Sequence, residues 1–315
     1  MKRRNFLKSV LLAPVPVLAG GPSVRTDPVR IKVAGLVARW VKDSDDYREE
    51  NFRRVETLIR EAAAAGAQVA CTSECFLDGY YREVTDQRAD LTDMSERCEV
   101  VKTSSYVTRL STLAKELQIT IVAGMAIREG ERLSNTAQLY TPEGQLAGLY
   151  RKTHNFGRHS AWFSSQSALE RSKSFPSFDL GLGVGRAGLM ICNDRNFAHT
   201  AFELARNGSQ VVFCPTGGGY DFTRLAEYCS RVGLWSVWVH PLGAAIVDWR
   251  GRTVVHRNNP LDLDSLAVPA AEIDSPDDQR FIVLGEVEMR SPILLPPSAD
   301  CPGDKYWPSP NRRIE

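Results

Sequence analysis

"YREENFRRVETLIREAAAAGAQVACTSECF", residues 47–76, is the segment from which the fold class follows most directly. Its first part is alanine-rich and amphipathic, which predicts a helix that ends at Gly66. A short apolar strand, VACTSECF (69–76), comes directly after it, and the apolar segment VRIKVAGLVARW (29–40) precedes it. The order strand, helix, strand predicts two parallel strands joined by a crossover helix.

The same alternation of helices and strands continues along the chain. Residues 106–118 have a helical pattern and lead into the apolar strand 119–127. Residues 135–154 and 243–257 alternate apolar and polar side chains around glycine-containing turns, which predicts two hairpins. The segment between them predicts strand 187–192, helix 199–208, strand 209–216 and helix 222–235. The chain is therefore expected to have an α/β fold.

Composition limits the classes of function. The chain has 315 residues, 43% of them hydrophobic, so it can bury a large core. Its 39 Lys and Arg residues nearly balance its 38 Asp and Glu residues, which argues against a nucleic-acid partner. No linker or repeat divides the body, so residues 26–315 are predicted to form one domain, with the proline-rich tail 301–315 as an extended arm.

Residues 1–25 differ from this body. A basic head, MKRRNFLK (1–8), precedes the apolar run SVLLAPVPVLAGG (9–21), and Arg3-Arg4 resembles a twin-arginine signal. The run is too short to cross a bilayer as a stable helix. We therefore expect export to the periplasm, with no stable membrane insertion once the signal is removed.

Seven cysteines lack the regular spacing of a disulfide scaffold. Cys71 and Cys75 have no second pair of ligands nearby, which disfavours zinc. Cys71, Cys214 and Cys229 are expected to be buried apolar residues. The sequence implies no metal and no organic cofactor.

Three polar residues stand at the ends of apolar strands, where sites form in α/β sheets. They are Glu74 after VACTS, Lys152 after LAGLYR and Cys192 after GLMI. Each alone has an ordinary structural explanation. Together they form a complete chemical set, because a cysteine nucleophile needs a base, an ammonium can hold an oxyanion, and a carboxylate can move protons.

At these residues the sequence resembles the carbon-nitrogen hydrolase, or nitrilase, superfamily, whose members use Glu, Lys and Cys in this chain order. The resemblance covers EAAAAGAQVACTSECFLDGY (61–80), NTAQLYTPEGQLAGLYRKTH (135–154) and GLMICNDRNF (188–197). It implies a four-layer αββα sandwich with Glu74, Lys152 and Cys192 as catalytic residues. It also implies association into a homodimer or a larger homo-oligomer.

The segment MICNDR (190–195) is similar to N-carbamoyl-D-amino-acid amidohydrolases. This similarity implies that Arg195 binds a substrate carboxylate, which a guanidinium can do with two parallel hydrogen bonds. It also implies that His154 helps to orient the site. Asn196 stands where the carbamoylases carry a second arginine, and Arg158 and His159 are candidate replacements. The superfamily's second glutamate, which steadies the lysine, falls on Glu170.

The function expected is therefore hydrolysis of a small linear amide or N-carbamoyl C–N bond through a thioester on Cys192, with release of ammonia or an amine. A nitrile substrate is less favoured. The alternatives are an acyltransferase that uses the same thioester and a non-catalytic binding protein on the same scaffold. A papain-like protease would need a histidine base downstream of Cys192, and His199, His240 and His256 are available. The run Gly217–Gly219 lacks the Lys and Ser/Thr of a phosphate loop and is expected to let the backbone turn beside the site.

Overall fold

The computed structural model describes residues 28–41, 44–79, 95–155, 170–258, 267–268 and 280–293. The predicted signal (1–25) and arm (301–315) lie outside these residues, as do Arg158 and His159. The two predicted hairpins, the predicted crossover helices and the predicted strands that they connect fall within the described residues.

The first sheet, as far as the structure describes it, has seven strands. Along it lie β15 (Phe281–Met289), β1 (Val29–Val37), β3 (Val69–Cys71), β5 (Thr120–Glu129), β6 (Arg132–Tyr140) and β7 (Leu146–Arg151), and β4 (Glu99–Val100) pairs with β5. β1, β3 and β5 are parallel, as the crossover helices α1 (Tyr47–Ala64) and α3 (Ser105–Leu117) require. β5, β6 and β7 are antiparallel, so the first predicted hairpin is β6–β7.

The second sheet, within the same described ranges, has six strands in the order β13 (Thr253–Asn258), β12 (Gly243–Val247), β11 (Trp235–His240), β10 (Val211–Pro215), β9 (Arg186–Leu189) and β8 (Ser177–Asp179). α5 (Ala198–Arg206) connects β9 to β10, and α6 (Thr223–Arg231) connects β10 to β11. β12 and β13 form the second predicted hairpin. A small separate pair joins β14 (Ala267–Val268) to β2 (Trp40–Val41).

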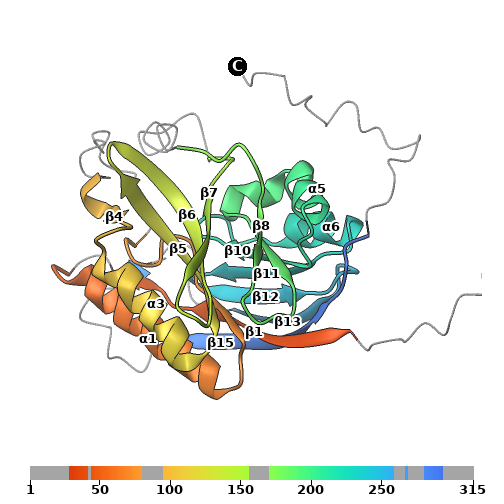
Figure 1. Cartoon of the computed structure of the whole chain (residues 1–315), viewed down its shortest axis with the longest axis horizontal. Coiled ribbons are helices and arrows are strands. Elements are labelled where there is room, and N and C mark those ends of the chain that lie inside the picture. Colours follow the sequence, from red (N-terminus) through yellow and green to blue (C-terminus); the bar gives the residue numbers. More distant parts are fainter. Residues whose placement is uncertain are drawn as a thin grey trace, which may run out of the picture.

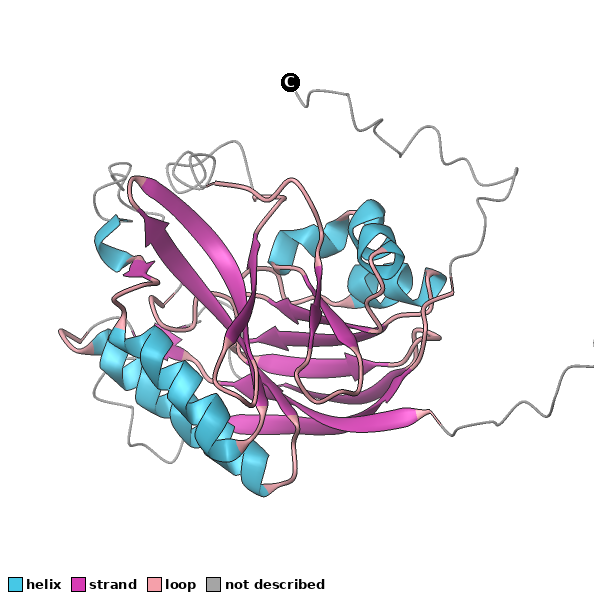
Figure 2. Cartoon of the chain, viewed as in Figure 1, coloured by secondary structure: helices cyan, strands magenta, loops and turns pink. Residues whose placement is uncertain are grey.

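The two sheets face each other, and helices cover their outer sides (Figures 1 and 2). Side chains along β1 alternate accordingly, because successive residues of a strand point to opposite faces. Ile31 and Val33 belong to the core between the sheets, whereas Ala34 and Leu36 pack with α1 and α3. The layers thus follow the order helix, sheet, sheet, helix of the expected αββα sandwich.

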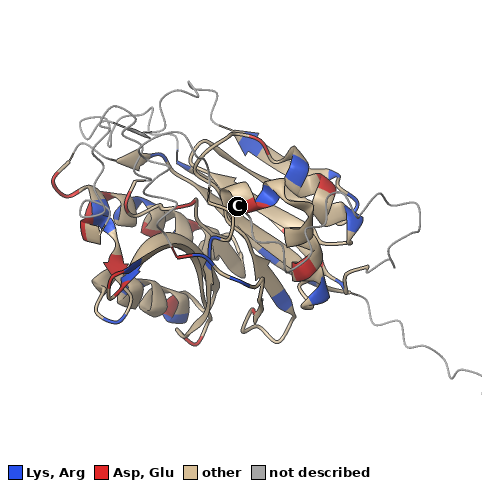
Figure 3. Cartoon of the chain, turned by 90° about the horizontal axis from the view of Figure 1, so that it is seen from above, with Lys and Arg blue, Asp and Glu red and all other residues tan. Residues whose placement is uncertain are grey.

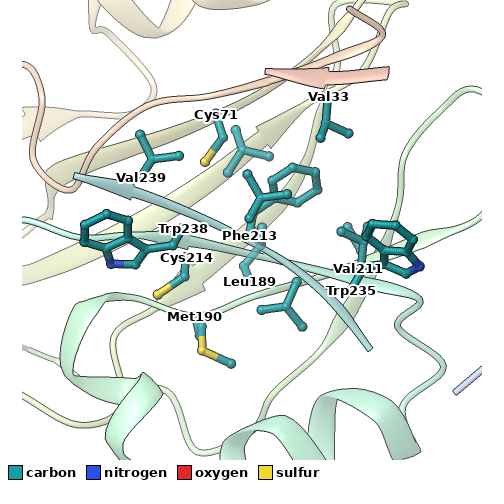
Figure 4. Packing of buried hydrophobic residues seen from close by; sticks show 14 of the residues in the cluster. Val33, Cys71, Leu189, Met190, Val211, Phe213, Cys214, Trp235, Trp238 and Val239 are labelled. Atoms are coloured by element: carbon teal, nitrogen blue, oxygen red, sulfur yellow. The ribbon is translucent and has the colours of Figure 1, made fainter. Parts of the chain in front are cut away.

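Figure 4 shows the core between the sheets. Val33 and Cys71 come from the first sheet, and Leu189, Phe213 and Val239 face them from the second. All five side chains are fully buried. This packing fixes how the strand ends of the two sheets lie relative to each other, and the polar residues that follow those strands are brought to one place.

The structure differs from the sequence predictions at a few element ends. The helix predicted to run to Trp235 stops at Arg231, because Gly233 takes a left-handed φ of 71° and β11 begins two residues later. The strand predicted over 69–76 is regular only to Cys71, so Glu74 lies in the loop that follows. The sequence patterns did not predict β11 and β15.

The described surface carries charges of both signs side by side (Figure 3). None of the described helices has the length and apolar character needed to cross a bilayer.

Candidate active site

Cys192 stands at a sharp turn just beyond β9. The chain leaves the strand with the Met190 amide donating to the Phe213 carbonyl at 3.1 Å, and it enters the short 3₁₀ helix η1 (Cys192–Asn196). Cys192 has a φ of 46°, a left-handed conformation that costs a non-glycine residue on the order of 1–3 kcal/mol. Its side chain is only 5% exposed. The turn therefore holds the sulfur in a defined position at the end of a core strand.

Asp194 fixes this turn from the inside. One of its carboxylate oxygens, Oδ2, accepts hydrogen bonds from the Ile191 amide at 2.9 Å and the Tyr150 hydroxyl at 2.8 Å. The other, Oδ1, accepts from the His154 amide at 2.8 Å and lies 2.7 Å from His154 Nδ1. Burial raises the pKa of Tyr150 well above its usual value, so its hydroxyl keeps the proton that it donates. His154 is thus joined through Asp194 to the turn that carries Cys192, and its predicted role in orienting the site stays a prediction.

Glu74 is completely buried in the loop after β3. Its Oε1 accepts hydrogen bonds from Lys152 Nζ and Asn135 Nδ2, both at 2.7 Å, and its Oε2 accepts from the Gly217 amide at 2.7 Å. Gly124 leaves the space for this loop, since a Cβ at that position would lie 2.9 Å from Glu74 Cα. The carboxylate is therefore held by one cation and two neutral donors.

Lys152 follows β7 and is also completely buried. Its amide donates to the Asn135 carbonyl at 2.9 Å, so the same asparagine holds both the backbone of the lysine and the carboxylate of Glu74. Burial disfavours the charged amine, but Glu74 and Cys192 outweigh it and raise the pKa of Lys152 above its usual value. The side chain is therefore a fixed ammonium.

The glycine run after β10 connects the acid to the sulfur. The Gly217 amide donates to Glu74, and the Cys192 thiol donates to the Gly218 carbonyl at 3.3 Å. Glu74 and Cys192 thus contact adjacent residues of one loop, and Lys152 lies against Glu74. The structure brings the three residues of the predicted triad to one place, and their roles in catalysis remain predictions.

Arg195 has partners other than the one expected. Its guanidinium donates to the backbone carbonyls of Gly218, Gly219 and Asp221, and to the Cys192 sulfur. Burial disfavours its charge, but Cys192 leads the neighbouring groups that together raise the pKa of Arg195 above its usual value. The Asn196 side chain donates to Asn193 Oδ1 at 2.8 Å. Arg195 therefore contacts the Cys192 sulfur, and the side-chain hydrogen bonds of both Arg195 and Asn196 run to groups of the protein itself.

The structure does not bring Glu170 to the triad. Its carboxylate is partly exposed and pairs with Arg132 at 3.5 Å and Arg151 at 3.7 Å. Arg151 and Lys152 are consecutive, and consecutive side chains at the end of a strand point to opposite faces. Glu170 therefore lies on the side of β7 that faces away from the buried ammonium, and the expectation that it steadies Lys152 is corrected.

The sequence patterns predicted no role for Asn135 or Asp194. Asn135 sits in the alternating pattern of β6 with nothing to distinguish it from a surface residue, although it is only 3% exposed. Asp194 lies within the polar cluster after Cys192, and its complete burial is the signal that a sequence cannot display.

Within the described residues, the other cysteines and the histidines of the protease alternative make no hydrogen bond to Glu74, Lys152 or Cys192. The six cysteines in the described part of the chain are free and buried, and burial raises the pKa of Cys214 to about 12. Within that part, no group of three or more His, Cys, Asp and Glu residues could hold a metal ion. The hydrogen bonds of the Cys192 sulfur run to Gly218 and Arg195 and to none of the histidines of the protease alternative.

The geometry defines a buried acid, ammonium and thiol site in an αββα sandwich, and comparison with known proteins agrees. The family model for carbon-nitrogen hydrolases matches residues 43–248, and the chain belongs to this family. It is 32% identical over 167 residues to a nitrilase of Pyrococcus abyssi, covering 53% of this chain and 58% of that protein. It is 31% identical over 180 residues to human omega-amidase NIT2, covering 56% of this chain and 60% of that protein.

The chain thus spans about three fifths of the length of these relatives. Among solved structures, it superposes on a carbon-nitrogen hydrolase from Helicobacter pylori with a TM-score of 0.64 at 15% identity, covering 82% of this chain and 89% of that one. This likeness shows that the fold is that of the nitrilase superfamily.

Proposed function

We propose that this protein hydrolyses a linear amide or N-carbamoyl C–N bond through a thioester on Cys192. One observation carries the proposal. The Glu74 carboxylate binds Lys152 at 2.7 Å and the Gly217 amide at 2.7 Å, while the Cys192 thiol binds the next residue, Gly218, at 3.3 Å. A proton carrier, a fixed positive charge and a nucleophile are thereby held around one loop, and the family and its amidase relatives support the same class of reaction.

In the first half of the reaction, Glu74 takes the thiol proton and the sulfur attacks the carbonyl carbon of the substrate. The oxyanion that forms is stabilised by the ammonium of Lys152, which stays charged because its pKa is raised. Glu74 then gives its proton to the nitrogen, the C–N bond breaks, and ammonia or an amine leaves. The acyl group remains on Cys192.

In the second half, Glu74 takes a proton from water, and the resulting hydroxide attacks the thioester. Lys152 again stabilises the oxyanion. The C–S bond breaks, the sulfur recovers the proton from Glu74, and the acid product leaves. For an N-carbamoyl substrate attacked at its carbonyl carbon, the same steps release an amine or ammonia and leave a carbamoyl or related acyl group on the sulfur for hydrolysis.

The test is ammonia and amine release from a panel of short linear amides and N-carbamoyl amino acids. We expect wild-type protein to turn over at least one member, Cys192→Ala to turn over none, and Glu74→Gln to be slower by about 100-fold or more. Cys98→Ala removes a buried thiol that packs against Leu133 and Ala126, and Glu227→Gln changes an exposed residue of α6; both are matched controls and should retain activity. Full activity of Cys192→Ala, or of wild-type protein treated with iodoacetamide, would refute the proposal.

The same panel separates the alternatives. Binding of panel members without release of ammonia or amine from any of them would favour a non-catalytic binding protein. Formation of a hydroxamate on addition of hydroxylamine, at the expense of the acid, would show that the thioester can pass its acyl group to an amine, as an acyltransferase does.

We also propose that the protein is exported in folded form by the twin-arginine route and assembles with copies of itself. The proposal of export rests on Arg3-Arg4 and the apolar run that follows. Replacing both arginines with lysine should keep the protein inside the cell, and its appearance in the periplasm would contradict this. Light scattering on the purified protein tests assembly, and a monomeric mass would contradict it.

A further inference from the structure

The N–H groups of the Arg195 guanidinium donate hydrogen bonds to acceptors within the protein. Arg195 is 6% exposed and stands one turn beyond Cys192 in η1. Nε donates to the Asp221 carbonyl at 2.8 Å, and Nη2 donates to the Gly219 carbonyl at 2.7 Å and the Gly218 carbonyl at 3.3 Å. Nη1 lies 3.4 Å from the Cys192 sulfur.

These bonds occupy both edges that a guanidinium offers to a carboxylate. A bidentate pair needs two parallel N–H groups, from Nε and Nη2 or from Nη1 and Nη2. The first edge holds Asp221 and Gly219, and the second holds Gly218 and the sulfur. A substrate carboxylate would have to displace a pair of these acceptors. Each buried carbonyl left without a donor would then cost free energy.

The loop is shaped to approach Arg195 closely. Gly219 has a left-handed φ of 68°, and a Cβ at that position would lie 3.0 Å from Nη2. The carbonyls of residues 218, 219 and 221 therefore converge on one guanidinium. The same loop donates the Gly217 amide to Glu74. Arg195 thus holds the segment that carries a hydrogen bond to the catalytic carboxylate.

The guanidinium also contacts the nucleophile, through Nη1. The sulfur must carry negative charge when it attacks, and a fixed cation in contact with it favours that charge. Lys152 hydrogen-bonds to Glu74, whereas Arg195 hydrogen-bonds to the sulfur, so each of the two reacting groups has a cation in direct contact.

We propose that Arg195 acts on the Cys192 nucleophile and on the loop 217–221, and does not bind the substrate. The site then accepts amides that have no carboxylate. The second part rests on the proposed hydrolase function, whereas the first concerns the sulfur alone. The substrate class that this predicts is short, uncharged amides.

Alkylation of Cys192 tests the first part without any turnover. Iodoacetamide and iodoacetate differ only in that the second carries a carboxylate, so their rates are compared in wild-type protein, Arg195→Gln and Arg195→Lys. We expect Arg195→Gln to slow alkylation by both reagents by the same factor. That factor should be about tenfold or more, which is the effect of losing one hydrogen bond to a charged group. An unchanged iodoacetamide rate with a selective loss for iodoacetate would overturn the proposal.

Arg195→Lys retains the charge and provides the same comparison if Arg195→Gln does not fold. It should slow the two reagents by a common factor smaller than that of Arg195→Gln, and a selective loss for iodoacetate would again overturn the proposal. Arg231→Gln, on the exposed face of α6, is the matched control and should leave both rates unchanged.

Butyramide and its carboxylated analogue succinamate test the second part. Wild-type protein should hydrolyse butyramide at least as efficiently as succinamate, and Arg195→Gln should lower kcat for both by one factor with little change in KM. A rise in KM confined to succinamate would contradict the proposal. If wild-type protein hydrolysed neither amide nor any other panel member, the hydrolase proposal would fail, while the alkylation result would still decide the role of Arg195.

Discussion

Replacing one partner of the Glu74–Lys152 pair is expected to destabilise the protein more than replacing both. Neither side chain has any exposed surface, and Lys152 Nζ lies 2.7 Å from Glu74 Oε1. Lys152→Met leaves the carboxylate with only Asn135 and Gly217 as donors, and Glu74→Gln leaves a buried ammonium without its counter-ion. Breaking a buried pair in this way costs about 3–5 kcal/mol.

The double variant Glu74→Gln/Lys152→Met removes both charges and keeps both shapes. It should cost no more than either single variant, because no uncompensated charge remains. Urea unfolding followed by tryptophan fluorescence measures this, since Trp238 is buried in the core. The same cycle on the exposed pair Glu227–Arg231 is the control and should show a coupling of at most about 0.5 kcal/mol.

Additive costs of the two single substitutions in the double variant would contradict this expectation. So would single variants that each cost less than about 1 kcal/mol, because such values are typical of ion pairs in water. Either result would mean that the pair is solvated, and the ammonium could then not be a fixed charge at the reacting carbonyl.

Three further predictions concern residues around the site. Burial first, and then the nearby arginine, lower the pKa of His240 to about 3, and its pKa in the unfolded chain is about 6.5. As the pH falls, the unfolded state therefore binds the proton before the folded state does. The wild-type protein should lose up to about 1.4 kcal/mol of its free energy of unfolding per pH unit as the pH falls from about 6.5 to 3. Urea unfolding at a series of pH values should give a smaller slope for His240→Asn. Asp194→Asn leaves one acceptor oxygen where the carboxylate offers one to Tyr150 and another to His154, so it should slow alkylation of Cys192 and lower the urea midpoint. Unchanged values would show that the turn at Cys192 does not depend on Asp194. Gly124→Ala places a methyl group against the Glu74 loop and should cost about 1–3 kcal/mol, and a stability equal to wild type would contradict the close approach.

Sequence patterns predicted the parts of the fold that depend on local periodicity. The α1 helix ends within two residues of Gly66, and both hairpins form around the expected turns, because these features are set by neighbouring residues. β15 was missed because its position depends on pairing with β1, more than 240 residues away in the chain. Such a partner leaves no mark on local periodicity.

The site residues also differ in whether a local sequence pattern marks them. Glu74, Lys152 and Cys192 were found because each follows an apolar strand, and the layers of the fold bring those strand ends together. The partners of Arg195 were out of reach because three of them are backbone carbonyls, which every residue type carries. Glu170 was misplaced because spacing from Lys152 does not show on which side of β7 a later side chain will lie.

Hydrolysis through a thioester requires Cys192 to carry the acyl group of the substrate during turnover. Mass spectrometry of wild-type protein, quenched with acid during steady-state hydrolysis of an active amide, tests it most directly. We expect one acyl group per chain, located by peptide mapping on Cys192 and accumulating further in Glu74→Gln if attack by water is slowed more than acylation. Turnover with Cys192 unmodified, or an acyl group mapped to another residue, would contradict it.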